Sequence, residues 1–323
     1  MGRYILKRLL MTVFVIVISS AVIFTLVYFV PGDPARVMLG AAADEDEIAR
    51  LNHSLGLDDS YFVQLGRFMY NAFIKLDLGT SWIRGTGVVD GMLQRLPYTL
   101  IMGIVMVSVS ALIGIPLGVL AAIHRNHWQD RVATSVAMFC ISVPDFWLAL
   151  MMIRIFSLTL GWLPSFGAES FTSYIMPVIA GAINGIGTLE RQTRSSMLEV
   201  IRSDFVVTAR AKGLKESVVV YKHMLKNALI PVLTVLGAAL SKCIAGVVII
   251  EQIFSLPGIG TYLTSGIGMR DYPIIRGCVI VLAIFIALLM LLVDLAYAAV
   301  DPRIKAQYAG QKKFKKHLKR GAA

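Results

Sequence analysis

The chain has 323 residues, of which 57% are hydrophobic and only 16% are charged, and its formal net charge is +11. So few charges cannot cover the surface of a soluble domain of this length, so the composition excludes a soluble globular protein. The basic excess does not predict a nucleic-acid partner, because most of the 31 Lys and Arg flank apolar runs on one side. That asymmetry is the positive-inside pattern of a membrane protein.

The first apolar run, Leu9–Val30, follows the basic residues Arg3, Lys7 and Arg8 and carries no charge. It is longer than the apolar core of a signal peptide and has no small-residue cleavage site after it, so it predicts a retained transmembrane helix. Further spans are predicted between Arg95 and Arg125, and over about 132–160, 173–189, 228–254 and 273–300.

These runs lack the alternation of barrel strands, and lipid offers no hydrogen-bond partners to a bare backbone. The predicted fold is therefore all-α and membrane-embedded, with six transmembrane helices and both termini in the cytoplasm. Residues 1–30 form the N-terminus and first span, residues 31–95 a large external loop with acids at Asp44–Glu47, and residues 96–300 a core of five spans. The basic tail, 301–323, is expected to lie near anionic lipid, with RNA as the alternative partner.

The long connection of residues 190–228, predicted to be cytoplasmic, carries more basic than acidic residues. Ser203 or Asp204 is expected to cap a short helix that ends near Lys212, and Gly213 to close it in a left-handed conformation. A second helix is then expected to lead to Pro231, which suits the first turn of the fifth span. The pattern predicts a compact docking knob.

The sequence contains no phosphate-binding GxxxxGK[ST] loop, no HExxH helix and no GxSxG turn. The chain is therefore not expected to be an enzyme or to bind a cofactor, and any ATP chemistry must lie on another chain. Cys140, Cys243 and Cys278 lie in apolar runs and predict packed thiols. His124 and His127 alone do not complete a metal site, and no metal is expected.

Ionisable residues at membrane depth are candidates for a substrate path, because a charge in lipid costs several kcal/mol unless it is satisfied. These candidates are Asp145, Lys242 and Arg154. One hypothesis pairs Asp145 with Lys242 and ties two spans together. In another, Lys242, with or without Arg154, lines a water-filled path and attracts a substrate carboxylate. Lys242 facing a partner subunit and Arg154 extending to the outer surface stay open as well.

Glycines with small-xxx-small spacing occur in two of the spans, at Gly114 with Gly118 and at Gly181 with Gly185. Because such positions let helices approach closely, they predict helix packing.

The segment Thr208–Leu214, with Leu225–Ala228 and Pro231, resembles the EAA loop of ABC-importer permeases, in the form of the dipeptide/oligopeptide/nickel branch. Val207 stands where the general pattern has glutamate. The resemblance extends along nearly the whole chain and is to the B-type permease with a long first outer loop. It rests on residues 31–34, 55–58, 77–79, 96–100, 114–118, 193–198, 254–260, 270–273 and 300–303.

The resemblance implies a type I importer fold in the bacterial inner membrane. It implies a second, related permease, two ATPase subunits that bind ATP and Mg, and an extracytoplasmic substrate-binding protein. Asp204, Ala209, Arg210, Lys212 and Gly213 would then couple this chain to the ATPases.

The expected function is import of di- or oligopeptides. The alternatives are a permease for nickel, a metal chelate or a glutathione-like small peptide, and, from different classes, a membrane channel or a membrane-embedded enzyme. A channel would need no docking knob, and an enzyme would need a convergent nucleophile or metal set, which the sequence does not show.

Overall fold

The computed structural model describes the backbone of residues 2–40 and 42–300, and their side chains except at 2–5, 7, 241–246 and 294–300. The predicted basic tail, 301–323, lies outside the described residues. The longer helices are α1 Gly2–Phe29, α3 Glu45–Leu55, α4 Tyr61–Phe73, α6 Leu96–Ile123, α7 Trp128–Ser142, α9 Ile175–Val200, α12 Lys226–Phe254, α13 Ile259–Gly268 and α14 Tyr272–Val300. The shorter elements are α2 Pro34–Leu39, α5 Val88–Leu93, α8 Asp145–Met152, α10 Asp204–Ala211, α11 Glu216–Val218, a 3₁₀ turn η2 Phe171–Tyr174, and the π-helical segments η1 Ile153–Thr159 and η3 Val219–Leu225.

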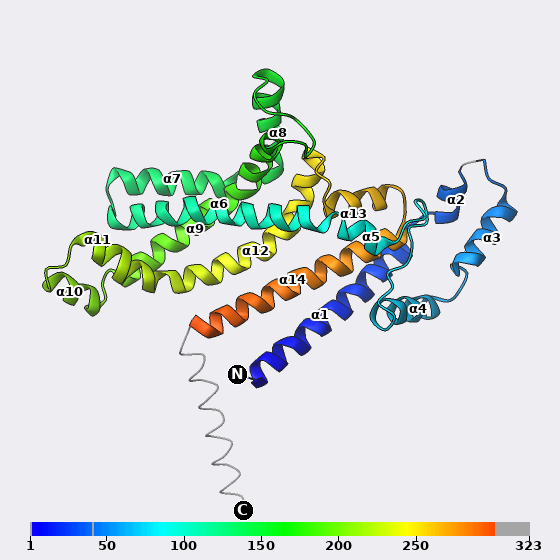
Figure 1. The fold of residues 1–323 in the computed structure, drawn as a ribbon, viewed down its shortest axis with the longest axis horizontal. Helices are drawn as coiled ribbons and strands as arrows, with labels where there is room; N and C mark the ends of the chain where they lie inside the picture. Colours follow the sequence, from blue (N-terminus) through cyan, green and yellow to red (C-terminus); the bar gives the residue numbers. More distant parts are fainter. Residues whose placement is uncertain (1, 41, 301–323) are drawn as a thin grey trace, which may run out of the picture.

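Five helical segments of the described chain are long and apolar enough to cross a membrane, and two further pairs qualify only as bent spans. Five of the predicted spans correspond to α1, α6, α9, α12 and α14. In Figure 1, α6 and α9 run together through the bundle and α1 lies along α14. The prediction of an all-α membrane protein is confirmed.

The third predicted span is not one helix, and this corrects the sequence prediction. It is divided into α7 and a second segment, α8 with η1, which are bent by 95° relative to each other. The break falls at Val143, which is extended (φ −83°, ψ 123°), just before Pro144. Proline disfavours helical geometry in the preceding residue and has no N–H of its own, so the helix stops there.

The start of the fifth span also differs from the prediction. Pro231 lies inside α12 instead of opening it, because helical structure runs without a gap from Glu216 through η3 into α12. At its other end, α12 meets α13 at a bend of 75°. Ser255 allows this bend by adopting a left-handed conformation (φ 51°) as the C-cap of α12.

The four small-xxx-small glycines lie where α6 and α9 cross, as predicted. A Cβ atom at Gly118 would lie 2.5 Å from the backbone oxygen of Glu190, and one at Gly114 would lie 2.6 Å from that of Ile186. From the other helix, a Cβ at Gly181 would lie 2.5 Å from Met106 Sδ. Since lipid provides no hydrophobic drive for helix association, this close backbone packing is the main source of attraction.

The external loop folds into α2–α5, and glycines form turns that follow α3 and precede α5. Gly56 closes α3 in a left-handed conformation (φ 67°), and its N–H donates to the carbonyls of Asn52 and His53. Gly79 (φ 83°) is held by an N–H donated to Asp77 Oδ1 at 2.8 Å. The acids Asp44–Glu47 occupy the N-cap and first turn of α3, where negative charges stabilise the helix by interacting with the positive end of its dipole.

A buried carboxylate holds the α12–α13 bend, and the sequence analysis did not identify it. Glu251 is fully buried and accepts hydrogen bonds from the Thr99 hydroxyl at 2.6 Å and the Gly260 N–H at 2.7 Å. A Cβ at Gly258 would lie 2.0 Å from the Glu251 carboxyl carbon, so a larger residue there would displace this carboxylate. This contact joins the starts of α6 and α13 to the end of α12.

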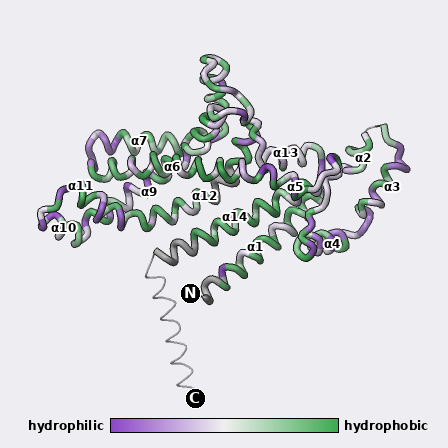
Figure 2. The backbone as a smooth tube through the Cα atoms, viewed as in Figure 1, coloured by the Kyte–Doolittle hydropathy of each residue, from purple (hydrophilic) through white to green (hydrophobic). Residues whose placement is uncertain are grey.

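Hydrophilic residues concentrate at the two ends of the molecule, as Figure 2 shows, around α10 and α11 at one end and around α3 and α4 at the other. The helices between them are mainly hydrophobic. Many large apolar side chains on these helices are exposed, including Phe14, Leu112 and Leu158. Such a surface is stable only in a hydrophobic surrounding, which fits a bundle embedded in lipid.

Candidate functional site

The segment from Asp204 to Leu225, here called the α10–η3 knob, projects at one hydrophilic end of the bundle (Figure 1). The N-cap residue just before the knob is Ser203; its side chain makes no capping hydrogen bond, so the predicted side-chain cap is not found. The predicted left-handed turn is present: Gly213 has φ 72°, and its N–H donates to the Arg210 carbonyl at 2.9 Å. The knob is thus a short helix, a glycine turn and a second helical segment.

One face of α10 is buried against the bundle. Val206 and Ala209, three residues apart, pack with Met197 of α9 and with Val220 and Met224 of η3. The small size of Ala209 therefore serves packing within this chain. These buried contacts fix the knob to the ends of α6, α9 and α12, so that a force on the knob reaches all three helices.

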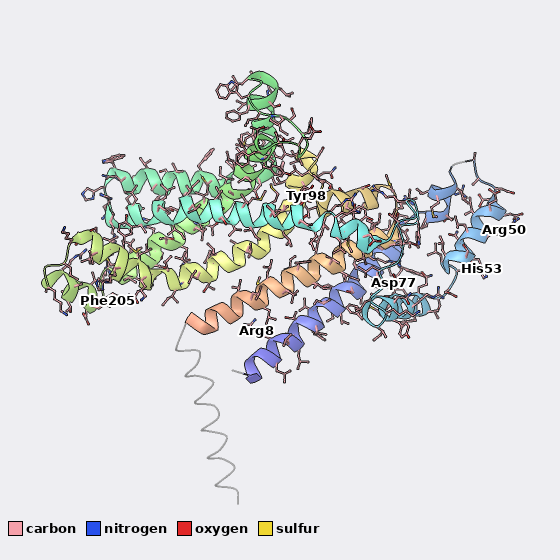
Figure 3. The ribbon with its side chains drawn as sticks, viewed as in Figure 1. Arg8, Arg50, His53, Asp77, Tyr98 and Phe205 are labelled. Carbon is pink, nitrogen blue, oxygen red and sulfur yellow. The ribbon has the colours of Figure 1, made fainter. Side chains whose placement is uncertain are left out.

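The opposite face of α10 is exposed and partly apolar. Phe205 is 43% exposed, Val207 59% and Tyr221, on η3, 62%. Asp204 and Lys212 are exposed on the same knob. In Figure 3, Phe205 lies at the opposite end of the molecule from Arg50, His53 and Asp77 of the external loop. A small exposed face that mixes apolar and charged side chains is suited to docking a partner protein.

Arg210 is engaged within the knob. Its guanidinium makes two hydrogen bonds to Glu216, with Nη2 to Oε1 at 2.6 Å and Nε to Oε2 at 3.2 Å. The hydrogen-bonded carboxylate raises the pKa of Arg210, so that the side chain stays charged. Because both side chains are exposed, the pair adds only about 0–1 kcal/mol to stability. Its geometric effect is to join α10 to α11 across the Gly213 turn.

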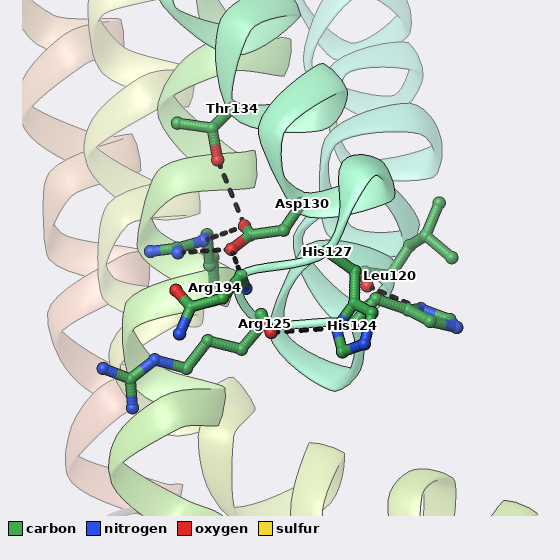
Figure 4. A network of polar contacts seen from close by, with 8 residues as sticks. Leu120, His124, Arg125, His127, Asp130, Thr134 and Arg194 are labelled. Carbon is green, nitrogen blue, oxygen red and sulfur yellow. Dashed lines mark hydrogen bonds and ion pairs between the residues drawn. The ribbon is translucent and has the colours of Figure 1, made fainter.

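A partly buried ion pair anchors the neighbouring hairpin between α6 and α7. As Figure 4 shows, the Asp130 carboxylate receives Nε and Nη2 of Arg194 at 2.6 and 2.9 Å and also the Asn126 N–H at 2.9 Å. The nearby histidines contact backbone carbonyls, with His124 Nδ1 3.1 Å from Leu120 O. A bidentate pair of this kind fixes α7 to α9 beside the knob.

A cavity of about 480 Å³ lies between α6, α8, α9 and α12. Its walls are mostly apolar or small, and its polar lining consists of Ser110, Asn184, Thr188 and Asp145. Ser110 is already bonded to the carbonyls of Met106 and Ala182. Among the described residues, Asp145 Oδ1 is buried without a hydrogen-bond partner. The cavity therefore contains one carboxylate with an unused acceptor.

The three candidate path residues occupy different places. Asp145 begins α8 at the break in the third span and lines the cavity. Arg154 lies on η1, is exposed, and is not part of the cavity wall. Lys242 belongs by its backbone to α12, seven residues after the cavity-lining Val235. Its side chain lies outside the described residues, so the Asp145–Lys242 pair stays a prediction.

Two further charged residues that pack inside the helical bundle were not singled out in the sequence analysis. Glu190 of α9 is fully buried with both carboxylate oxygens lacking a partner among the described residues. Arg276 of α14 lies over the rings of Phe24, Phe68 and Tyr272. Glu190 and Arg276 each lie near the end of a predicted span, where a charged residue is expected at the membrane boundary and therefore drew no notice. Glu251 lies inside the fifth predicted span but was not singled out.

Two family models together match most of the chain. Residues 114–306 match the binding-protein-dependent transport system inner membrane component, and residues 1–103 match the N-terminal model of such membrane components. The chain is 38% identical over 305 residues to the glutathione transport system permease protein GsiC of Salmonella paratyphi A. It is 39% identical over 313 residues to a Brucella abortus permease protein provisionally named for peptide transport. Each alignment covers 94% of this chain and 99% of the relative.

Solved structures show the same fold. A chain of the inward-facing MetNI methionine ABC transporter superposes with a TM-score of 0.56 at 20% identity, over 65% of this chain and 96% of that one. A chain of an amino acid ABC transporter crystallised with histidines gives a TM-score of 0.55 at 14% identity, over 65% and 94%. The predicted type I importer architecture is confirmed by these likenesses.

Proposed function

Because this chain belongs to the family of binding-protein-dependent transport system inner membrane components, we propose that it forms half of the translocation pathway of an ATP-driven importer for small peptides. Two relatives, one named for glutathione and one for peptides, support this substrate class. Glutathione is itself a tripeptide, so the two names describe one kind of cargo. The chain is a multi-pass membrane permease, and we place it in the bacterial inner membrane with both termini in the cytoplasm.

The α10–η3 knob carries the coupling part of the proposal. Its buried face is held by the ends of α6, α9 and α12, while its exposed face presents Phe205, Val207 and Tyr221. We propose that this face docks on an ATPase subunit, which supplies ATP and Mg. A homologous second permease, a second ATPase and an extracytoplasmic binding protein at the 31–95 loop complete the proposed assembly.

The helices that hold the knob also line the cavity. α9 contacts the knob through Met197 and lines the cavity with Gly181–Thr188, and α12 lines it from Val235 onward. A push on the knob would therefore tilt the cavity walls as rigid elements. Closure of the ATPases would in this way exchange inward-open and outward-open states.

The assembly can be tested by expressing the chain with the neighbouring genes of its operon and purifying it in mild detergent. We expect an ATPase pair and a second permease to co-purify. Vesicles that contain this complex are expected to accumulate glutathione or a dipeptide only when ATP and the binding protein are both present. Uptake or conductance without ATP would show a channel, and uptake of a nickel chelate but of no peptide would support the metal-chelate alternative.

A substitution at Lys242 tests the proposed substrate path. Lys242→Met is expected to lower ATP-driven peptide uptake roughly tenfold, the effect of losing about 1.4 kcal/mol of interaction with a carboxylate. The thermal midpoint of the complex should stay unchanged. Asp145→Asn and the double variant Asp145→Asn/Lys242→Met complete a double-mutant cycle, in which uptake and thermal midpoint are measured for each variant.

The same cycle tests the competing hypothesis of an internal ion pair. If Asp145 and Lys242 bind each other, each single variant leaves a buried charge without a partner and lowers the thermal midpoint. The double variant then recovers stability, because both charges are gone. Such recovery would replace the path role with a structural one.

A further inference from the structure

A second cavity, of about 420 Å³, lies at the end of the molecule that carries the external loop. Its walls come from the loop before α5, the start of α6, the α12–α13 bend and α13 itself. In Figure 1, α5 and α13 lie near α2, far from α10 and α11. In the orientation proposed above, this cavity opens on the outside of the membrane.

Two arginines from different elements meet on one aromatic ring in this cavity. The Arg95 guanidinium lies 4.4 Å from the centre of the Tyr262 ring, and that of Arg84 lies 5.5 Å from it. Arg95 also donates to the Gly91 carbonyl at 2.6 Å, and Arg84 to the Ser265 hydroxyl at 2.9 Å. Each guanidinium has five N–H donors, so most of them are free for another acceptor.

Neither arginine has a carboxylate partner in the part of the chain that the structure describes. This differs from two other arginines of the external loop, since Arg36 pairs with Glu45 and Arg67 with Asp59. The remaining polar wall of the cavity is neutral, with Gln252, Ser255, Thr261, Thr264 and Ser265. Two positive charges therefore face a neutral polar cavity.

One acid close to this group, Asp271, is occupied elsewhere. Asp271 is fully buried, and its carboxylate accepts from the Ser81 hydroxyl and the N–H groups of Trp82 and Ile83. These contacts fix the loop that carries Arg84, because the Ser81 hydroxyl in turn accepts the Arg84 N–H at 2.9 Å. Asp271 thus positions Arg84 without neutralising it.

We propose that this cavity binds the carboxylate of a peptide substrate on its way into the membrane, through Arg84 and Arg95. The inference rests on the peptide import proposed above. Guanidinium groups bind carboxylates with two parallel hydrogen bonds, and the hydroxyl groups of the cavity suit the amides next to a chain end. The volume is within the range of small-ligand sites.

The site is distinct from the Asp145 cavity. Ile250 lines the Asp145 cavity and Gln252 lines the arginine cavity, and residues two apart lie on nearly opposite faces of a helix. Glu251, between them in the sequence, is buried and accepts hydrogen bonds from Thr99 and Gly260. The structure therefore has an outer cationic site and a separate inner cavity on either side of α12.

The test measures direct peptide binding to the full transporter complex in lipid nanodiscs, without the binding protein. Saturation-transfer NMR titrations compare trialanine with trialanine amide, which lacks the carboxylate. We expect the wild-type complex to bind trialanine at least tenfold more tightly than the amide. In the double variant Arg84→Gln/Arg95→Gln, trialanine is expected to bind as weakly as the amide.

The matched control is Arg67→Gln, which removes an outer arginine that already pairs with Asp59; trialanine binding should not change. Equal binding of trialanine and its amide to the wild-type complex would overturn the proposal without needing any variant. Unchanged trialanine binding in the double variant would overturn it too. If a separate pull-down with added binding protein shows that this variant no longer retains that protein, the arginines are assigned to an acidic surface of the binding protein.

Two further arms separate the remaining explanations. Nanodiscs with and without phosphatidylglycerol are compared, and trialanine binding that disappears only in anionic lipid would assign the arginines to lipid phosphate. ATP-driven uptake is measured separately, in sealed vesicles that contain the same wild-type complex, with ATP and the binding protein both supplied. Its absence would overturn the proposed function, whereas uptake with equal acid and amide binding overturns the carboxylate site alone.

Discussion

Replacing Gly213 with valine is expected to reduce ATP-driven uptake at least tenfold and to abolish the stimulation of ATPase activity by substrate. Gly213 has φ 72°, a conformation that a β-branched residue adopts only at a cost of about 1–3 kcal/mol. The valine variant would relax the turn and shift α10 relative to η3. The exposed face of the knob would then dock on the ATPase in a shifted position, so that movement of the ATPase would no longer be transmitted to the helices that line the cavity.

The matched control for this experiment is Gly213→Asn. A Cβ atom at position 213 would meet no atom within 4 Å, so neither side chain is excluded by space. Asparagine tolerates the left-handed conformation, and this variant should retain uptake within a few-fold of the wild type. Both rates are measured with the reconstituted complex. Normal substrate-stimulated ATPase activity in Gly213→Val would remove the coupling role of the turn.

Replacing Gly118 with alanine is expected to destabilise the bundle by about 1–3 kcal/mol, the usual cost of overpacking. The added Cβ would lie 2.5 Å from the backbone oxygen of Glu190 and 2.6 Å from Thr193 Cβ. The backbone of α9 cannot yield as a flexible side chain can, so α6 and α9 must separate. Because this pair also supports the knob through Val119 and Met197, the yield of assembled complex should fall as well.

The control for Gly118 is another glycine inside a helix, Gly66 of α4. A Cβ there would meet no atom within 4 Å, and Gly66→Ala is expected to be neutral or stabilising by about 0.4–1 kcal/mol. The measurement is the thermal midpoint of each purified complex together with its yield. Equal midpoints for Gly118→Ala and the wild type would show that the α6–α9 contact is looser than the structure indicates.

Local patterns were enough to predict much of the functional arrangement. The glycine turn at Gly213 follows from a left-handed backbone conformation that glycine favours, and the close packing at Gly118 follows from its small size. The knob was predicted because its signals lie within a few residues of one another. Whether Asp204, Arg210 and Lys212 contact an ATPase stays a prediction.

Only the tertiary structure showed which contacts form between elements that are distant in the sequence. Ala209, one of the residues that the resemblance assigns to ATPase coupling, is buried against η3 and α9. Arg84 and Arg95 meet on the Tyr262 ring only because the external loop folds back on α13.

The sequence by itself determined that this protein is helical and membrane-embedded, because apolar length and basic flanks act locally; its permease family followed from the resemblance of its motifs. It could not determine the break before Asp145, the Glu251 contact with Thr99 and Gly260, or the two cavities. The break follows a local proline, but whether a proline bends or ends a helix depends on its neighbours. The buried contacts and cavities depend on how whole helices pack, and no local pattern encodes that packing.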